Sequence, residues 1–325
     1  MESHNNQKKI AVVNDLTGFG RCALTVAIPV ISVMGLACCP VPTSILSNHT
    51  AFESCFIDDY TDKMERYIRE WEKLGLKFNG IYTGFLGSEA QIDIVRHFFK
   101  TFSSEDTVLV IDPVMGDHGR TYRTYTQPMC QAMKKLVTLG NIITPNVTEA
   151  CILTDTPYQE VWTEQELYAL ASKLLSMGPE KAVITGAVVG SHGFGVKAPE
   201  ANAGDGVYGN YCMDARGGQL ITYTLAGASR CGTGDLFASI IAADAVNGVS
   251  LDVSVKKAAD FVAKAIRLSA QMEIPSTDGV SFEPLLWELA VKDGGEGAEL
   301  GRGQPVYPSQ TVWKVFEYEH AEVLF

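Results

Sequence analysis

Short apolar runs alternate with amphipathic segments along this chain, and each run ends abruptly in polar or glycine residues. The clearest runs are residues 9–13 (KIAVV), 107–111 (TVLVI), 141–144 (NIIT) and 181–185 (KAVIT). Apolar runs without alternation are typical of strands that are buried on both faces, as in parallel sheets. Helices must cover both faces of such a sheet, so we predict an α/β fold with a central, mainly parallel sheet.

The segments between these runs carry apolar residues at helical spacing. In residues 60–74 the spacing is i, i+4, i+7, i+8, i+11 and i+14, which predicts an amphipathic helix. Ser88 with Gln91, and Thr163 with Glu166, predict capping boxes at two further helix starts. The remaining elements are expected as helices over about 21–34, 128–137 and 250–271, as strands at 42–46 and from Gly80, and as an antiparallel pair over 207–211 and 220–224.

Composition narrows the class of protein. The 26 Lys and Arg residues against 38 Asp and Glu give a net charge of −12, which argues against nucleic acid as a partner. The eight cysteines form no C-x-x-C pair, which suits reduced thiols in the cytoplasm. No apolar run reaches the ~18 residues of a membrane span, and the N-terminus lacks the apolar core of a signal peptide. We expect a soluble, cytoplasmic protein that does not bind membranes.

The chain shows neither an internal repeat nor an obvious linker. We therefore expect one domain over residues 1–290, followed by a C-terminal tail, 291–325, that begins glycine-rich and whose role is left open. Residues 186–206, rich in Gly, Ala and Asp, fit either a mobile flap or a long surface loop.

Residues 228–245 (ASRCGTGDLFASIIAADA) read as a glycine-bearing loop that enters a helix. A helix N-terminus presents unpaired N–H groups and the positive end of the dipole, so it favours bound anions such as phosphate. Asp235 stands at the mouth of this helix. Its carboxylate could cap the helix or accept a proton from a substrate hydroxyl, and the motif alone leaves both alternatives open.

Other strand ends carry polar residues as well. After the run 9–13, residues 14–20 (NDLTGFG) are expected to form a glycine-bearing loop. Asp112 directly follows the run 107–111, and Asn146 with Glu149 follows the run 141–144. In open α/β sheets ligands bind at the carboxyl ends of the strands, although turn formation through Asp and Pro is the alternative.

Five motifs follow one another along the chain: SNHT (47–50), TGFLGS (83–88), DPVMGD (112–117), TPNVTE (144–149) and GTGDLFAS (232–239). In order and spacing they resemble those of pyridoxal kinases in the ribokinase-like superfamily, over roughly residues 8–290. The resemblance implies transfer of the ATP γ-phosphoryl group to the 5′-hydroxymethyl group of pyridoxal, pyridoxine or pyridoxamine. It also implies a homodimer.

The resemblance assigns a role to each motif. It makes Asp235 the catalytic base, beside an anion hole formed by the amides of Cys231, Gly232, Thr233 and Gly234. It implies magnesium near Asp112, Glu149 and Asp117, and a monovalent cation (K⁺ or Na⁺) near Thr144 and Thr185. It implies nucleotide contacts from Asn146, Thr185, Gly232, Thr233, Asp112 and Glu149. It also implies a substrate pocket that contains His49, Thr50 and Phe85. The chain has no G-x-x-x-x-G-K-[ST] loop, so helix-end amides and cations must carry the phosphate charge.

The chain departs from the family pattern at Asp15, where better-known pyridoxal kinases carry serine. We hypothesise that this carboxylate pairs with the pyridinium nitrogen or with the ammonium group of pyridoxamine. Arg230 offers a cation for phosphate or is a surface arginine. A hydroxymethylpyrimidine kinase is the rival within the class, and a catalytically silent carrier of pyridoxal or nucleotide is the rival outside it.

Overall fold

The computed structural model describes residues 7–123, 125–190, 207–224 and 230–290. Its strands are β1 (Lys9–Phe19), β2 (Ala37–Asn48), β3 (Ile57–Asp59), β4 (Gly80–Thr83), β5 (Val108–Ile111), β6 (Gly116–Asp117), β7 (Arg120–Thr121), β8 (Ile142–Ile143), β9 (Lys181–Val188), β10 (Val207–Asp214) and β11 (Gly217–Thr224). Its α-helices are α1 (Ala23–Val33), α2 (Thr61–Leu74), α3 (Glu89–Phe102), α4 (Gln127–Val137), α5 (Val147–Thr154), α6 (Glu164–Ser176), α7 (Thr233–Asn247) and α8 (Leu251–Gln271), and two 3₁₀ helices follow, η1 (Ser276–Asp278) and η2 (Glu283–Leu289).

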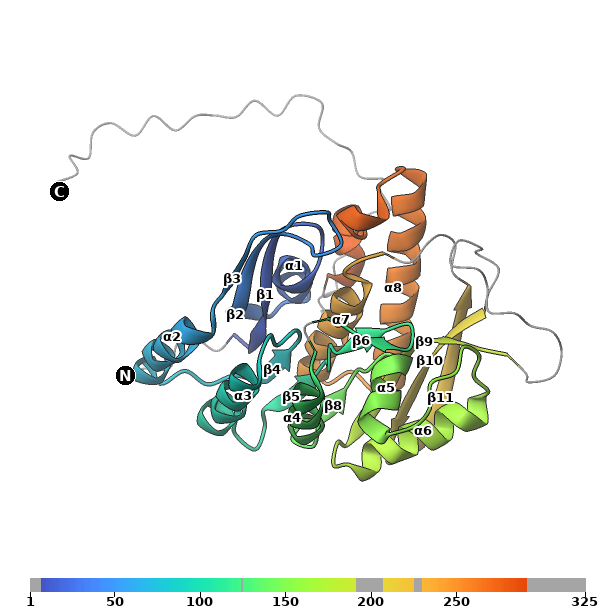
Figure 1. The fold of residues 1–325 in the computed structure, drawn as a ribbon, viewed down its shortest axis with the longest axis horizontal. Helices are drawn as coiled ribbons and strands as arrows, with labels where there is room; N and C mark the ends of the chain where they lie inside the picture. Colours follow the sequence, from blue (N-terminus) through green and yellow to red (C-terminus); the bar gives the residue numbers. More distant parts are fainter. Residues whose placement is uncertain (1–6, 124, 191–206, 225–229, 291–325) are drawn as a thin grey trace, which may run out of the picture. The chain divides into compact units, whose positions relative to one another are not determined.

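One sheet organises the part of the chain that the structure describes. Its nine strands run in the order β11-β10-β9-β8-β5-β4-β1-β2-β3. Neighbours from β2 to β9 pair in parallel, whereas β3 pairs antiparallel to β2 and the β10–β11 hairpin pairs antiparallel to β9. The predicted mainly parallel sheet is confirmed (Figure 1).

Helices cover both faces of this sheet, as expected (Figure 1). One buried cluster joins apolar residues of α2 to α6 to one face, and a second joins α1, α7, α8 and η2 to the other. In the first, Trp71, Phe78, Phe98 and Phe102 pack ring against ring, so Trp71 of α2 packs against the core, as its spacing predicted. The two layers leave the ends of the strands free to carry a site.

The first strand corrects one expectation. Residues 14–20 were expected to form a loop, but β1 continues to Phe19 and pairs with β2 beyond a register shift between Asn14 and Leu16. Parallel pairing with the long strand β2 satisfies the backbone there in spite of Gly18. Asn14 and Asp15 therefore lie on a paired strand rather than in a glycine-bearing loop.

The sequence also missed helix α5, since residues 145–149 were read only as the end of a strand. Asn146 and Glu149 form a complete capping box at its start. The expected box of Thr163 and Glu166 is confirmed, but Ser88 forms only half of one: its side chain accepts from Gln91 N, while Gln91 Oε1 accepts from Gly87 N at 2.7 Å.

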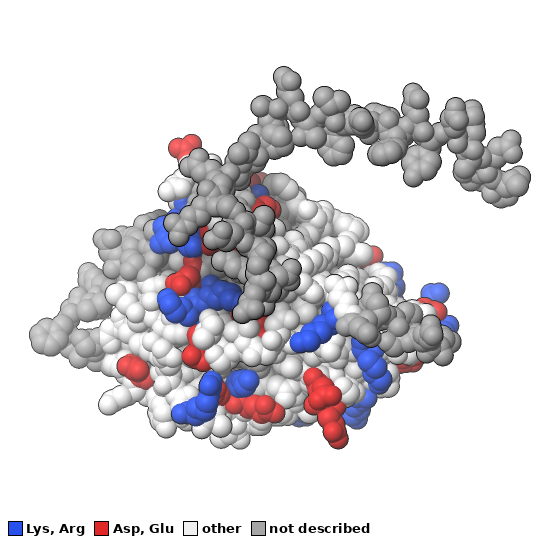
Figure 2. All heavy atoms as spheres, turned by 180° about the vertical axis from the view of Figure 1, so that it is seen from behind, with Lys and Arg blue, Asp and Glu red and all other residues white. Residues whose placement is uncertain are grey.

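Basic and acidic side chains are interspersed on the face shown in Figure 2. Among the described residues, no helix combines the length and the apolar character needed to cross a membrane. All eight cysteines are free thiols. Most of the 186–206 segment and the whole 291–325 tail lie outside the described residues.

Candidate functional site

Asp235 lies in the first turn of α7, but it is not the N-cap. Gly232 is the N-cap, and it makes no side-chain capping bond. The Asp235 carboxylate instead faces β1, where Asn14 Nδ2 donates to Oδ1 at 3.2 Å. Burial raises the pKa of Asp235, while hydrogen bonds from the Ala23 backbone and from Asn14, and the nearby His49 ring, lower it. The geometry favours a carboxylate held toward the strand edge over a simple helix cap.

The loop before α7 is shaped by one obligatory glycine. Gly232 has φ +79°, and a Cβ placed there would overlap the carbonyl oxygen of Arg21. A Cβ on Gly234 would meet open space. The amides of residues 233–235 begin the helix, where backbone N–H groups have no intrahelical acceptor. This exposed helix start can bind an anion next to Asp235.

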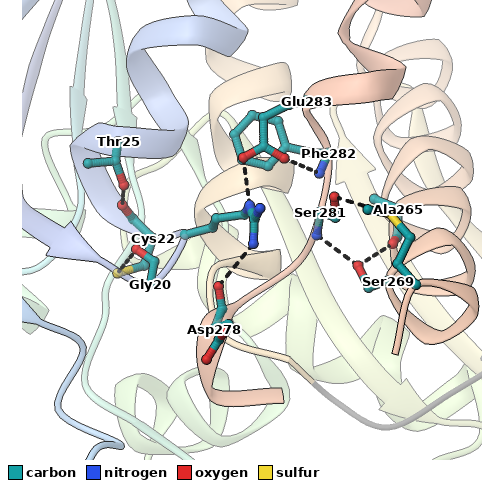
Figure 3. A network of polar contacts seen from close by, with 11 residues as sticks. Gly20, Cys22, Thr25, Ala265, Ser269, Asp278, Ser281, Phe282 and Glu283 are labelled. Carbon is teal, nitrogen blue, oxygen red and sulfur yellow. Dashed lines mark hydrogen bonds and ion pairs between the residues drawn. The ribbon is translucent and has the colours of Figure 1, made fainter. Parts of the chain in front are cut away.

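Arg21 approaches this loop and is bonded to the segment 274–283, whose Asp278 and Glu283 are labelled in Figure 3. The Arg21 Nε donates to Glu283 Oε1 at 2.6 Å and its backbone N donates to Asp278 O at 3.3 Å. Arg230 is also engaged by this segment, because its Nη1 donates to the carbonyls of Ile274 at 2.6 Å and Pro275 at 3.2 Å. Both arginine side chains thus donate hydrogen bonds to backbone carbonyl groups. This weakens the expectation that Arg230 binds phosphate.

Asp15 and His49 approach Asp235 from β1 and from the end of β2. Thr17 Oγ1 donates to Asp15 Oδ2 at 2.6 Å. Burial, and to a smaller extent the charge of Asp235, raise the pKa of Asp15 to about 6. The His49 Nδ1 lies 3.4 Å from Cys231 Sγ, and burial lowers the pKa of this histidine although Asp235 raises it. The structure therefore brings Asp15, His49 and Cys231 together around Asp235.

Of two other residues expected in the substrate pocket, Phe85 lies beside the site and Thr50 lies away from it. Phe85 is partly buried against the core beside the site, and its backbone N donates to Asn14 Oδ1 at 2.8 Å. Thr50 is exposed in the turn after β2. Its position does not bring it into the buried cluster around Asp235.

Asp112 and Glu149 lie at the ends of neighbouring chain segments on the other side of Asp235. Burial, and to a smaller extent the charge of Asp235, raise the pKa of Asp112 to about 8, and the Thr144 side chain partly counters both effects. Burial and the charge of Asp112 raise the pKa of Glu149 well above its usual range. Its two oxygens accept from Met115 N at 3.0 Å and Asn146 N at 2.8 Å, so Glu149 ties this edge together.

The remaining nucleotide-side candidates have structural contacts of their own. Asn146 Nδ2 donates to Gly116 O at 2.8 Å while its Oδ1 accepts from Glu149 N, so its amide is engaged by the fold. Thr185 N donates to Pro145 O at 2.9 Å and lies at the end of the same edge. Asp117 is exposed on β6, where its Oδ1 accepts from His118 N at 2.7 Å.

Four carboxyl groups thus follow one another along the edge, from Asp15 through Asp235 and Asp112 to Glu149. Among the described residues, no lysine or arginine is one of the groups that lower their pKa values, and the His49 ring, which can become cationic, lowers that of Asp235. A row of buried acids without a cation is costly unless a ligand supplies one. Within the described residues no three His, Cys, Asp or Glu side chains form a ready metal cluster.

The sequence missed Asn14 as a site residue. Its side chain is fully buried and connects Asp235 on α7 with Phe85 after β4. A Cβ on Gly84 would overlap the Asn14 amide, so the close approach depends on that glycine. The signal was present in the sequence, since a polar asparagine directly follows the apolar run 9–13 just as Asp112 follows the run 107–111.

The sheet and its strand-edge site define a ribokinase-like kinase fold, which the chain shares with the crystal structure of pyridoxal kinase from Lactobacillus plantarum at a TM-score of 0.76 and 27% identity, over 87% of this chain and 96% of that one. The chain belongs to the phosphomethylpyrimidine kinase family, whose sequence profile matches residues 28–279. It is therefore a member of a family of phosphotransferases.

Two further relatives are close in sequence or structure. A protein from Bacteroides thetaiotaomicron VPI-5482, provisionally named phosphomethylpyrimidine kinase, has a TM-score of 0.82 and 37% identity over 91% of this chain and 98% of its own. Its orthorhombic crystal form contains pyridoxal. The pyridoxine/pyridoxal/pyridoxamine kinase of Bordetella avium (strain 197N) is 26% identical over 282 residues, which span 83% of this chain and 90% of the relative.

Proposed function

We propose that this protein is a vitamin B6 kinase that transfers the ATP γ-phosphoryl group to the 5′-hydroxymethyl group of pyridoxal, pyridoxine or pyridoxamine. The observation that carries the proposal is the position of Asp235, between the start of α7 and the Asp15–His49 side of the site. The relatives named for vitamin B6 and the pyridoxal in the Bacteroides protein support this substrate class.

In this proposal Asp235 is the general base. A primary alcohol is a weak nucleophile until a carboxylate takes its proton, and burial raises the affinity of Asp235 for that proton. The amides at the start of α7, from Cys231 to Gly234, face the charge that develops on the transferred phosphoryl group. Binding, orientation and proton removal thus meet within one helical turn.

The acid row fits the magnesium ion that ATP brings. Asp112 is 7% exposed, and the nearby Thr144 Oγ1 and Thr83 Oγ1 are buried with no hydrogen-bond partner of ordinary geometry in the structure. These are oxygen donors of the kind that hard cations prefer, and Mg²⁺ keeps several waters rather than a full protein cage. Asp112 would hold the ion, with Glu149 acting through water, Asp117 approaching from β6, and Thr144 with Thr185 on offer to a monovalent cation.

A bound magnesium ion would supply charge neutralisation for the phosphoryl oxygens. The protein's own residues then orient the nucleotide side: Glu149 fixes the loop at Met115 and the start of α5, and Asn146 fixes Gly116. Removing Mg²⁺ should abolish turnover, and thermal stabilisation by ADP should depend on added Mg²⁺ in the wild type and weaken in Asp112→Asn.

Asp15 is the proposed selector among the B6 vitamers. It is buried, Thr17 orients it, and no lysine or arginine is among the groups that shift its pKa. A cationic ring nitrogen or ammonium group would supply the missing charge. The test compares kcat/KM for the three vitamers in wild type and Asp15→Ser; unchanged ratios would remove this role.

Hydroxymethylpyrimidine phosphorylation is the second candidate, because the family description and the name of the Bacteroides relative favour it. The decisive experiment offers pyridoxal, pyridoxine, pyridoxamine and hydroxymethylpyrimidine side by side with Mg-ATP and measures ADP release and phosphorylated product. We expect the highest kcat/KM with a B6 vitamer. A clear preference for the pyrimidine would replace the proposal, and product from none would support a silent carrier.

A homodimer and a cytoplasmic location complete the proposal. Exposed apolar side chains gather near the β3 edge of the sheet, among them Phe19, Ile45, Phe56 and Ile57, and such a patch is typical of an interface. The eight free thiols suit a reducing compartment. Sedimentation of the wild type and of Phe56→Ser would test the interface, with a shift to monomer expected in the variant.

A further inference from the structure

The asparagine that follows the first apolar run joins three parts of the site. Asn14 Oδ1 accepts from Phe85 N at 2.8 Å and from Asp15 N at 3.0 Å, and its Nδ2 donates to Asp235 Oδ1 at 3.2 Å. The side chain is fully buried, and the Gly84 backbone is packed against its amide. An asparagine amide has one acceptor oxygen and one donor nitrogen, so the two backbone donors fix which end faces Asp235.

We propose that Asn14 is the positioning residue of the catalytic base: it holds one oxygen of Asp235 as an acceptor toward β1 and leaves the other for the substrate hydroxyl. This rests on the proposed function of Asp235. The two backbone N–H groups orient the amide so that its NH₂ group is the end that meets Asp235. Asn14 itself need not touch the substrate.

The same contact links the base to the ring side of the site. Phe85 N is bound to the amide that orients Asp235, and Thr43 Oγ1 donates to Phe85 O at 3.1 Å, so β2, β4, β1 and α7 are tied through this residue. A shift of Asn14 would move the base relative to the substrate. We therefore expect kcat to fall more than the KM for ATP rises, because the anion-binding amides do not depend on this contact.

Asn14→Asp isolates the donated hydrogen bond. The substituted side chain keeps an acceptor oxygen for Phe85 N and Asp15 N, but it loses the NH₂ group and places a second carboxyl beside Asp235. We expect kcat to fall by about 10- to 100-fold, the range of a lost hydrogen bond to a charged group. The acid limb of the kcat/KM profile should move to higher pH by about one unit or more, since a neighbouring carboxylate makes Asp235 harder to ionise.

Several other groups face Asp235 and stay constant in this comparison. They are Asp15 on β1, Cys22 before α1, His49 after β2, Tyr82 on β4, Asp112 after β5, Tyr122 after β7 and Cys231 before α7. If the acid limb of the kcat/KM profile moves in Asn14→Asp, the change is therefore assigned to position 14.

Asn141 provides a matched control. Its Oδ1 accepts from Leu109 N at 2.8 Å and its Nδ2 donates to Glu180 Oε1 at 3.0 Å, the same chemical arrangement at the opposite ends of the strands. Asn141→Asp should leave kcat and the pH profile within about twofold of wild type, as an exposed pair does. Equal kcat and an unmoved acid limb in Asn14→Asp and wild type would overturn the proposal.

A double-variant cycle measures stability instead of activity, so it remains informative if Asn14→Asp folds poorly. In Asp235→Asn with Asn14→Asp, the amide and the carboxyl exchange places, so the bond can form in the reverse direction. Urea unfolding should show that Asn14→Asp lowers the folding equilibrium constant by about tenfold or more in the wild-type background and much less in Asp235→Asn. Equal losses in both backgrounds would overturn the coupling, and wild type that phosphorylates nothing would refute the proposed function while this cycle still decides the contact.

Discussion

Helix α7 carries two carboxylates whose surroundings are opposite. Asp244, toward its C-terminal end, is 1% exposed and receives Lys257 Nζ at 2.7 Å and Ser254 Oγ at 2.8 Å from α8. Asp235, in the first turn, receives an amide and backbone groups but no lysine or arginine. Among the described residues, Lys257 neutralises Asp244, which holds two helices together, whereas the groups that lower the pKa of Asp235 are hydrogen-bond donors and the titratable His49 ring.

Carboxylates at the edge of the sheet and carboxylates on the surface of the described chain differ in the same way, in whether a lysine is their partner. Surface acids such as Glu288 and Asp260 have lysine partners, whereas Asp15, Asp112 and Glu149 are buried with neutral donors. Where a carboxylate stabilises the fold, the protein supplies the positive charge that neutralises it. Where a carboxylate serves a ligand, the ligand supplies that charge, and the free protein loses folding free energy.

The largest stability effect should come from Asp244→Asn. Loss of this carboxylate leaves Lys257 without its buried partner, although the lysine side chain is 38% exposed and can reach water. We expect the free energy of unfolding to fall by about 3 kcal/mol, the lower end for a broken buried pair. Urea unfolding measures it, and a change below about 0.5 kcal/mol would show that Asp244 is no more a structural acid than Asp235.

Asp15→Asn should act in the opposite direction. A pKa near 6 in place of 3.8 corresponds to about 3 kcal/mol. Because the folded state holds the Asp15 proton more tightly, the contribution of Asp15 to stability is fully present below pH 3.8 and is lost as the pH rises through 6.

Replacing the Asp15 carboxyl with an amide avoids that loss. The unfolding free energy of Asp15→Asn relative to wild type should rise between about pH 4 and pH 7.5, because titrating groups that do not interact with Asp15 cancel in the difference. If the difference in unfolding free energy does not change with pH, the ionised Asp15 carboxylate does not destabilise the folded protein.

The start of α7 should be sensitive to a methyl group at one glycine and tolerant at the next. Gly232→Ala forces a Cβ into the Arg21 carbonyl at a positive φ, whereas Gly234→Ala points into open space. We expect a loss of about 2 kcal/mol or more for the first and less than about 0.5 kcal/mol for the second in thermal or urea unfolding. Equal losses would show that the loop is not set by this close approach.

The smallest effect should follow Glu283→Gln. The Arg21–Glu283 pair has side chains that are 31% and 49% exposed, and the backbone bond from Arg21 N to Asp278 O remains without it. Unfolding should change by less than about 1 kcal/mol. A larger loss would make this ion pair, rather than the Gly232 contact, the main brace of the loop.

Much of the fold could be predicted because parallel strands and amphipathic helices have local signals. The runs at 9–13 and 107–111 became β1 and β5, and residues 60–74 became α2. The extension of β1 through Gly18 could not be predicted, since its hydrogen bonds come from β2, some 25 to 30 residues away. Local turn residues gave the opposite signal there.

The site was predictable only as a set of strand ends. Asp235, Asp112 and Glu149 each stood at a recognisable boundary, but the sequence could not show that Glu149 uses both oxygens on backbone N–H groups or that Arg230 is engaged by Ile274. Those contacts join residues that are distant in the chain. Asn14 was missed for the same reason, because its partners lie 71 and 221 positions away.

The most direct test compares Asp235→Asn with Asp244→Asn on the same helix. Both would be assayed with pyridoxal and Mg-ATP, at a temperature and protein concentration where both are fully folded. The account predicts that kcat/KM falls by about 10²-fold or more in Asp235→Asn, with stability unchanged or raised, and stays within about threefold in Asp244→Asn. An active Asp235→Asn enzyme, or equal losses in the two variants, would contradict the claim that the carboxylate without a cation is the one that does the chemistry.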